Sequence, residues 1–565
     1  METKLVIYQI LPRLFGNTKQ LNIPNGTIQQ NGCGKMSAFT PHVLETIRKM
    51  GVNCIWFVGI PEHATTTQYP EANIPAEHPD IVKGRAGSPY AIKDYYDVSP
   101  DIADNPATRR EEFDNLVKRC HQQGLKVLID FVPNHVARNY SSDAIPYAIA
   151  DLGQNDKQSV AFDHNNNFYY IPGKPFIPPN SRPDDESNYQ EFPARATGNN
   201  CFAPNPSSSD WYETAKLNYG IDFLNNEKCR FSPIPDTWYK MRSILMYWVE
   251  KHVDGFRCDM AEMVPVEFWN WVIPEIKSQY PDTIFLAEIY NQHRYHEYFH
   301  VGKFDCLYDK SGLYDTIRNV ISGLAPASDI TKCWQSLGDL QGRMLNFVEN
   351  HDEQRVASDF FAADPLKARP AFAVAAAINT GPVLLYAGQE LGERGMEAEG
   401  FSGIDGRTTI FDYWSVSTLR RWYNGGKTDS ELLTAEEREL QTFYVKMMQI
   451  CNSSPAIREG RFFDLMYVNP AGRHFNPQYH FAWMRCYGEE LVLIVANFDS
   501  SDADINIFVP ENAFNYFNLH RPVFTSATDM ITGEISPAEL KRNSSCPINV
   551  GKHNAKILRF SYPGT

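Results

Sequence analysis

The sequence predicts an α/β fold: a (β/α)₈ TIM barrel with a domain inserted after the third strand and an antiparallel β-domain at the C-terminus. Three observations support this prediction. Strand-like apolar runs alternate with helix-like stretches over most of the chain. Acidic residues follow several of these runs at intervals that fit barrel units of about 31 residues. After residue 455, short runs typical of antiparallel strands replace that alternation.

The elements before and after the insert can be taken in order. Apolar runs predict strands at residues 6–10, 52–58, 125–132 and 253–256. Helical patterns predict helices at residues 41–50, 109–123 and 238–251. A Pro- and His-rich loop is expected up to residue 100. Further strands are expected at residues 285–291 and 347–352, and the motif at residues 382–390 is expected to contain the eighth strand.

These patterns divide the chain into four segments. Two stretches, 1–135 and 235–454, are expected to form the barrel. Between them, residues 136–234 are rich in Asn, Pro, Asp and aromatic residues and form the expected insert. Residues 455–565 are expected to form a β-sandwich domain, with strands predicted at 480–485, 491–496, 505–509 and 556–562 and a hairpin turn at 488–490.

Composition limits the classes of partner. The 53 Lys and Arg residues against 68 Asp and Glu residues give a net charge of −15, which argues against nucleic-acid and anionic-membrane partners. The longest apolar stretches, at 371–378 and 382–387, are shorter than the roughly 20 residues that span a bilayer. The 11 cysteines lack paired spacing, and the N-terminus lacks a signal-peptide pattern, so we expect a cytoplasmic protein. Export, with a signal removed beforehand, is the alternative.

Carboxylates recur where barrel strands are predicted to end. Glu288 lies 29 positions after Asp259, or about one unit, and Asp352 lies 64 positions after Glu288, or about two units. With Asp130, these residues are expected at the ends of strands 3, 4, 5 and 7, on the face where such barrels carry chemistry. Arg257 and Asp259 alternate with Cys258 and are expected on one side of their strand, where the guanidinium would hold Asp259 ionised. An isolated pair of this kind would more often be structural.

Two carboxyl groups in different environments are what glycosidic bond cleavage requires. Asp259 beside Arg257 is the expected ionised group. Glu288 is flanked by Leu286, Ala287 and Ile289, and apolar surroundings would favour its protonated form. Because their strands are adjacent, we expect the short carboxyl separation of retaining enzymes.

Four motifs together resemble the conserved regions of the α-amylase superfamily, glycoside hydrolase family 13. They are LIDFVPNH at 128–135, GFRCDMAEMV at 255–264, FLAEIYN at 285–291 and FVENHD at 347–352. The resemblance covers residues 8 to about 451, with the insert as domain B. It implies that Asp259 is the nucleophile, Glu288 the general acid/base and Asp352 the stabiliser of the transition state.

The same resemblance implies roles for further residues. Tyr90 matches the family's stacking tyrosine, and His135 and His351 would bind sugar hydroxyls at the cleavage site. Arg257 would orient Asp259, and Asp130 would support Arg257. Asn134 matches a residue that ligates a structural Ca²⁺ ion in many members, although the chemistry itself requires no cofactor.

Two further motifs bear on the subgroup of the superfamily that the chain resembles. Ala215-Lys216-Leu217-Asn218 resembles the M-P-K-L-N motif of neopullulanases and cyclomaltodextrinases. Residues 260–269 are similar to that group's V-A-N-E-V-x-x-x-F-W pattern, but Met263 stands in place of its Glu. That group's N-terminal β-domain is not expected, because the first predicted strand begins close to Met1.

The expected substrates are maltooligosaccharides or related glucans with α-1,4 links, with α-1,6 links as a further option. Two alternatives remain open at this point: a transglycosylase using the same site, and a non-catalytic barrel that binds carbohydrate or acts as a scaffold. The sequence also leaves open the link preference, chain length, endo or exo action, Ca²⁺ dependence and oligomeric state.

Overall fold

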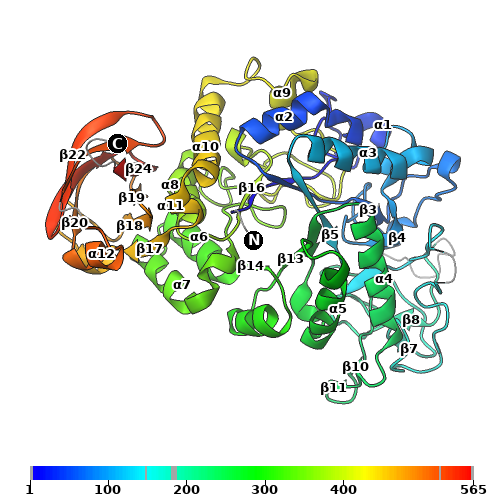
Figure 1. The fold of residues 1–565 in the computed structure, drawn as a ribbon. Coiled ribbons are helices and arrows are strands. Elements are labelled where there is room, and N and C mark those ends of the chain that lie inside the picture. Colours follow the sequence, from blue (N-terminus) through cyan, green and yellow to red (C-terminus); the bar gives the residue numbers. More distant parts are fainter. Residues whose placement is uncertain (1–3, 147–148, 180–187, 521–522, 561–565) are drawn as a thin grey trace.

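The computed structural model describes residues 4–146, 149–179, 188–520 and 523–560 (Figure 1). Its centre is a parallel eight-stranded sheet in the order β15-β14-β13-β12-β5-β2-β1-β16. A parallel bridge between Asn346 and Val383 joins the two edges. The sheet therefore closes into the expected barrel. Its strands are β1 Val6–Ile10, β2 Cys54–Phe57, β5 Lys126–Phe131, β12 Gly255–Cys258, β13 Ile284–Ala287, β14 Cys306–Tyr308, β15 Met344–Leu345 and β16 Val383–Tyr386.

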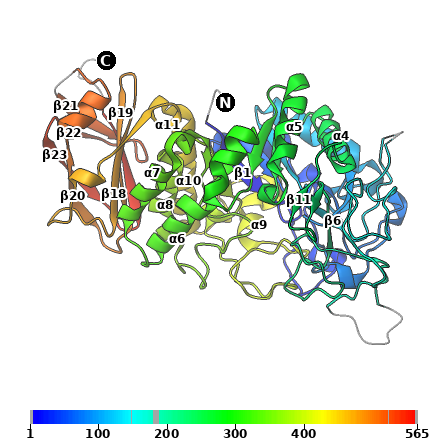
Figure 2. The ribbon, with the colours of Figure 1, turned by 90° about the horizontal axis from the view of Figure 1, so that it is seen from below.

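Helices surround the barrel (Figures 1 and 2). In α2, Thr40 caps the N-terminus, Pro41 occupies the first turn, and Val43, Leu44 and Ile47 form the buried face. This pattern is typical of a helix that packs one side against a sheet. The main helices are α2 Pro41–Lys49, α3 Arg109–Gln122, α4 Asp236–Glu250, α5 Val266–Gln279, the π-helix η8 Glu297–Val301, α6 Asp315–Ile321, α7 Ile330–Leu337, α8 Ala368–Ala377 and α10 Ala435–Ser453.

Two predictions for the barrel were wrong. The strand expected at 347–352 is instead β15, Met344–Leu345, so the following segment is a loop. The loop expected up to residue 100 contains β3 Pro61–His63 and β4 Ile92–Val98, which pair antiparallel. The sequence pattern did not predict β4, because its buried residues include the charged Lys93 and Asp97. Glu77 pairs with Lys93, and Arg109 lies 2.6 Å from Asp97.

The insert adds short antiparallel pairs to the barrel. They join β6 His135–Ala137 to β9 Thr214–Lys216, β7 Tyr170–Ile171 to β8 Ala194–Arg195, and β10 Ile221–Asp222 to β11 Lys228–Cys229. Arg138, which follows β6, connects the first two pairs: it lies 2.8 Å from Glu191, donates to the Tyr212 carbonyl at 2.9 Å and to the Arg195 carbonyl of β8 at 2.8 Å, and covers the Phe176 ring. The domain limits given above remain predictions.

The C-terminal part is antiparallel, as expected. One sheet has the order β17-β18-β19-β24-β21-β22, and β20 pairs with β23. The pairing of Tyr487 with Glu490 confirms the expected hairpin turn. Trp483 and Arg485 donate to the Ala377 carbonyl of α8 and join this part to the barrel. The strands are β17 Arg461–Asp464, β18 His480–Tyr487, β19 Glu490–Asn497, β20 Ala503–Val509, β21 Val523–Asp529, β22 Ile535–Lys541, β23 Ser544–Val550 and β24 Asn554–Phe560.

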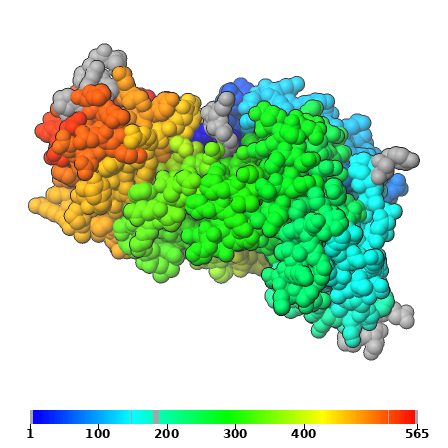
Figure 3. Space-filling view, turned by 60° about the horizontal axis from the view of Figure 1, so that its bottom comes forward, coloured from blue at the N-terminus to red at the C-terminus, as the bar shows by residue number. Residues whose placement is uncertain are grey.

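The insert and the C-terminal β-domain lie at opposite ends of the molecule (Figure 3). The barrel between them shares one hydrophobic core with the β-domain. All 11 cysteines are free thiols. Within the described ranges, no helix combines the length and the apolar character needed to cross a membrane.

Candidate active site

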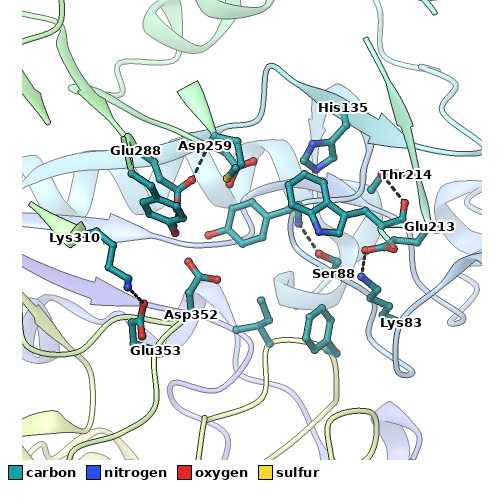
Figure 4. Close-up of a pocket in the computed structure, with 16 residues that line it drawn as sticks. Lys83, Ser88, His135, Glu213, Thr214, Asp259, Glu288, Lys310, Asp352 and Glu353 are labelled. Atoms are coloured by element: carbon teal, nitrogen blue, oxygen red, sulfur yellow. Dashed lines mark hydrogen bonds and ion pairs between the residues drawn. The ribbon is translucent and has the colours of Figure 1, made fainter. Parts of the chain in front are cut away.

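A cavity of about 450 Å³ opens at the C-terminal ends of the barrel strands. Asp259, Glu288 and Asp352 line it together (Figure 4). Asp259 and Glu288 directly follow the last residues of β12 and β13, and Asp352 lies seven positions beyond β15. The barrel thus brings together the three acids that the sequence places in separate segments.

The buried Arg257 guanidinium links four acids, here called the Arg257 cluster: Asp130, Asp259, Glu288 and Asp352. Its Nη1 lies 2.6 Å from Asp259 Oδ1, and its Nη2 lies 2.7 Å from Glu288 Oε1. Asp130 lies 3.4 Å away and Asp352 4.0 Å away. Arg257 therefore contacts Asp259, as the resemblance implies, and it also holds Glu288.

The surroundings of Glu288 differ from those expected. Besides Arg257, its carboxylate accepts hydrogen bonds from the Met260 backbone N–H at 2.7 Å and the Tyr290 hydroxyl at 2.8 Å. Met260 adopts a left-handed backbone conformation with φ of 43°, which is unusual for this residue type. The expected apolar surround is therefore wrong, because neighbours from two barrel strands supply polar contacts.

Opposing effects act on the ionisation of Asp259. Burial raises the pKa of Asp259 well above its usual range, and the charges of Glu288 and Asp130 add to this effect, whereas Arg257 lowers it. Burial likewise raises the pKa of Asp130 to about 7. One guanidinium is shared by four carboxyl groups, so it only partly offsets the burial of Asp259 and Asp130, while its contact at 2.6 Å stabilises the ionised form of Asp259.

The tyrosine and the two histidines suggested by the resemblance differ in their position relative to the cavity. Tyr90 and His135 line the cavity, whereas His351 is not part of that lining and packs against Tyr90. The Tyr90 ring stacks on His351 at 5.3 Å, and its hydroxyl is 2.5 Å from His351 Nε2. The same nitrogen lies 3.2 Å from Asp352. Burial lowers the pKa of both histidines to about 3, so they are neutral hydrogen-bonding groups.

The sequence interpretation missed several residues that line the cavity. Lys310 directly follows Asp309, the first residue after β14, so the strand-end rule had the information to find it. The insert contributes Trp211, whose ring lies 5.2 Å from that of His135, and no periodic pattern marks it. The full set of missed residues is Lys83, Ser88, Trp211, Glu213, Thr214, Met260, Tyr290, Lys310, Glu353, Ile410 and Phe411.

The surroundings of Asn134 do not fit the Ca²⁺ ion suggested for it. Its Oδ1 accepts a hydrogen bond from Lys216 Nζ at 2.7 Å, and its Nδ2 donates to the Gly198 carbonyl at 2.8 Å. Lys216 is buried, and burial lowers its pKa to about 7. An amine thus contacts the amide oxygen that a cation would need, so no chemical step is assigned to a metal here.

The fold and this site define a (β/α)₈ barrel with an acid cluster on its catalytic face. The model of the α-amylase catalytic domain matches residues 9–438 of the chain. The protein belongs to the α-amylase family.

Curated relatives are distant. The chain is 22% identical over 492 residues to α-amylase 2 of Dictyoglomus thermophilum, covering 85% of this chain and 66% of that protein. It is 23% identical to a cyclomaltodextrinase of a Bacillus species, covering 78% and 70% of the two chains. It is 28% identical to a maltose-1-phosphate maltosyltransferase of Cereibacter sphaeroides, covering 49% of this chain and 36% of that protein.

Solved structures share the fold. A noncanonic maltogenic α-amylase from Thermotoga neapolitana matches with a TM-score of 0.62 and 20% identity over 99% of both chains. An α-amylase from Geobacillus thermoleovorans, complexed with acarbose, matches with a TM-score of 0.63 and 17% identity over 99% of this chain and 98% of that one. The whole chain, including the insert and the C-terminal part, thus has structural counterparts.

Proposed function

We propose that this protein is a retaining glycoside hydrolase acting on α-glucans with α-1,4 or α-1,6 links. One observation carries the proposal: a single guanidinium contacts both Asp259 and Glu288 at the cavity wall. Two carboxyls that share one guanidinium are held close together, in keeping with the separation of about 5–5.5 Å in retaining enzymes.

In the first step, Asp259 attacks the anomeric carbon while Glu288 donates a proton to the leaving oxygen. The bond to that oxygen breaks, and a glycosyl ester forms on Asp259. In the second step, Glu288 takes a proton from water, and the resulting nucleophile releases the sugar. Asp352, whose side chain is 38% exposed, faces the cavity and would stabilise the positive charge that develops on the ring.

The relatives support an α-glucan as the substrate. They include proteins named α-amylase, cyclomaltodextrinase and neopullulanase, and solved relatives were complexed with acarbose or maltose. The cavity offers aromatic faces from Tyr90 and Trp211 beside its acids. Aromatic faces and hydrogen-bonding groups together suit the apolar faces and hydroxyls of a sugar.

Transfer to a sugar hydroxyl remains the second candidate, supported by the maltosyltransferase relative. A phosphorylated donor would favour a cation beside the cavity. However, Lys83 lies 2.8 Å from Glu213, and Lys310 lies 3.2 Å from Glu353. Because both lysines that line the cavity are paired, we favour water or a sugar hydroxyl as the acceptor and an unphosphorylated glucan as the donor.

The test is sugar release by the wild type and the Asp259→Asn variant. Products from maltohexaose, pullulan and a cyclodextrin are quantified at several substrate concentrations. We expect a loss of about 10⁴-fold or more in the variant. Longer products that grow with substrate concentration would indicate transfer. Equal inactivity of both proteins on the whole panel would favour the non-catalytic barrel instead.

A further inference from the structure

Two histidines and one carboxylate meet on the surface of the barrel, apart from the residues that line the cavity. His296 directly precedes the π-helix η8 and His300 lies within it, while Asp339 lies in the 3₁₀-helix η11, Gly338–Arg343. All three side chains are exposed, and one potential ligand atom from each lies within 4.8 Å of those from the other two. This group is called the His296 cluster.

The His296 cluster lies on the barrel face opposite the cavity. The helical segment that ends with η8 follows β13 and leads back to the start of β14 at Cys306 (β13 and β14 are labelled in Figure 1). In the next unit, η11 ends at Arg343, directly before β15 begins at Met344. The cluster therefore lies where β14 and β15 begin, whereas the cavity opens where barrel strands end. In barrels of this kind, the face where strands begin supports stability rather than chemistry.

The helical backbone brings the two imidazole rings together. Residues four positions apart in a helical segment face the same side, and the rings of His296 and His300 stack with centroids 5.7 Å apart and 14° between their planes. The ring of Phe299 packs edge-on against His300 at 5.0 Å, and the Arg343 guanidinium lies 5.7 Å from the centre of the Phe299 ring. Although it is exposed, the His300 ring is thus positioned by two neighbouring rings.

Asp339 completes the set of ligand atoms. Its Oδ1 lies 3.7 Å from His296 Nδ1, and its Oδ2 lies 3.2 Å from His300 Nε2. Within the described ranges, its carboxylate has no other hydrogen-bond or ion-pair partner. The ammonium group of Lys303 donates instead to the His300 carbonyl at 2.8 Å. One carboxylate is therefore shared by two imidazoles.

A pair of ordinary His–Asp ion pairs explains this arrangement less well than a metal ion does. Two protonated imidazoles would exceed the charge of the single carboxylate, and like charges four positions apart in a helix repel each other. Neutral imidazoles avoid that repulsion. Together with a carboxylate, they are groups that bind Zn²⁺ in proteins.

We propose that His296, His300 and Asp339 bind a Zn²⁺ ion, with water in the fourth position. Zinc takes imidazole nitrogen at about 2.0–2.1 Å and carboxylate oxygen at about 2.0–2.2 Å, so neighbouring ligands of a tetrahedral site lie about 3.3–3.5 Å apart. The observed separations of 3.2 and 3.7 Å lie on either side of that range, so small side-chain adjustments suffice. Ca²⁺ and Mg²⁺ prefer oxygen ligands and do not suit two imidazoles.

A bound zinc ion would join two units of the barrel. It would connect η8, which leads to β14, with η11, which leads to β15. Because these segments lie away from the cavity, the ion would stabilise the fold without contacting the substrate. This inference does not depend on the proposed reaction.

The test uses the full chain without a polyhistidine tag, which would itself bind zinc, after treatment with EDTA and desalting. ZnCl₂ is titrated by calorimetry, and Tm is measured with and without ZnCl₂. We expect one ion per chain and a Tm rise of about 2 °C or more at saturation. A large excess of CaCl₂ or MgCl₂ should not reduce zinc binding, because neither ion competes well for imidazole.

Four variants locate the ion. His296→Ala and His300→Ala each remove one imidazole and should weaken zinc binding about tenfold or more. Two controls should bind zinc like the wild type: His293→Ala, which removes an exposed imidazole of the adjacent η7, Gln292–Arg294, and Cys229→Ser, which removes an exposed thiol. Because all four positions are exposed, the variants should fold, and circular dichroism checks this.

Any of four results would overturn the assignment. No zinc binding by the wild type, or binding that is unchanged in both His296→Ala and His300→Ala, would remove zinc from this cluster. A loss in Cys229→Ser as large as in the histidine variants would assign the ion to a thiol. Displacement of zinc by excess CaCl₂ would indicate a site made of oxygen ligands elsewhere.

Discussion

The acids of the Arg257 cluster and the acids of β4, Asp94 and Asp97, both lie on the barrel, but their polar partners are arranged differently. In the first, a single buried guanidinium faces all four acids, and a cavity of about 450 Å³ opens over three of them. In the second, Arg109 and Arg110 both contact Asp97, while Asp94 accepts hydrogen bonds from the Ser142 hydroxyl and the Asp143 N–H. Several acids that share one cation beside an open cavity favour proton chemistry, whereas acids that each have their own partners are typical of a structural role.

After replacement of Asp259 itself, the largest expected effect is that of Glu288→Gln, which keeps the shape of the side chain but removes its ability to transfer a proton. Hydrolysis of maltohexaose should fall by about 10³-fold. A substrate with a good leaving group, such as an α-glucosyl fluoride, should lose less in the first step because departure then needs little proton donation. Full activity on maltohexaose would remove Glu288 from the acid role, with circular dichroism as the check on folding.

The two guanidinium groups can be compared through the same substitution. Arg257→Lys should lower kcat by about 10²-fold, because an ammonium group cannot contact Asp259 and Glu288 from two fixed nitrogens. Arg109→Lys keeps a single ion pair with Asp97 and should leave kcat within about twofold while lowering Tm by a few degrees. Similar kcat losses in the two variants would contradict the special role of Arg257.

A smaller effect on activity is expected when the residue that the insert contributes to the cavity, Trp211, is replaced. Trp211→Ala should raise KM for maltohexaose about tenfold with little change in kcat, because the ring contributes binding surface rather than a reacting group. Phe192→Ala is the matched control, since Phe192 is also an aromatic residue of the insert but is 69% exposed and does not line the cavity. A loss confined to kcat would instead place Trp211 in the chemical step.

The smallest effect concerns stability and pH. Burial raises the pKa of Asp130 from 3.8 to about 7, so the folded chain holds a proton there at pH values where the unfolded chain has lost it. The stability that this group contributes is complete below about pH 4 and is lost as the pH rises through 7. Asp130→Asn should therefore flatten the fall in urea midpoint between pH 4.5 and 8. An unchanged slope would show that Asp130 is not the group responsible.

Part of this account could be predicted from the sequence, and the reasons differ by residue. Strand periodicity and spacing placed Asp259 and Glu288 at barrel strand ends, because those signals are local. The contacts around Glu288 were not predictable, since Arg257 and Met260 approach it from the neighbouring strand and the segment after it. The apolar residues that flank Glu288 in the sequence therefore led to a wrong prediction of its surroundings.

The cavity residue of the insert and the strand β4 were not predicted from the sequence, for a different reason. Trp211 reaches the cavity from a segment without periodicity, so only tertiary structure reveals it. The charged residues of β4 obscured a buried strand, because Arg109 and Glu77, which neutralise them, lie elsewhere in the chain. Charge patterns of this kind become interpretable only after the partners are known.

The most direct test of the central claim is to trap the covalent intermediate. The protein is incubated with a fluorinated α-glucosyl fluoride that slows the second step, and the labelled peptide is identified by mass spectrometry. The account predicts one sugar per chain attached to Asp259, and no labelling of Asp259→Asn. A sugar on Glu288 or Asp352, or a product with inverted anomeric configuration from the unmodified substrate, would contradict it.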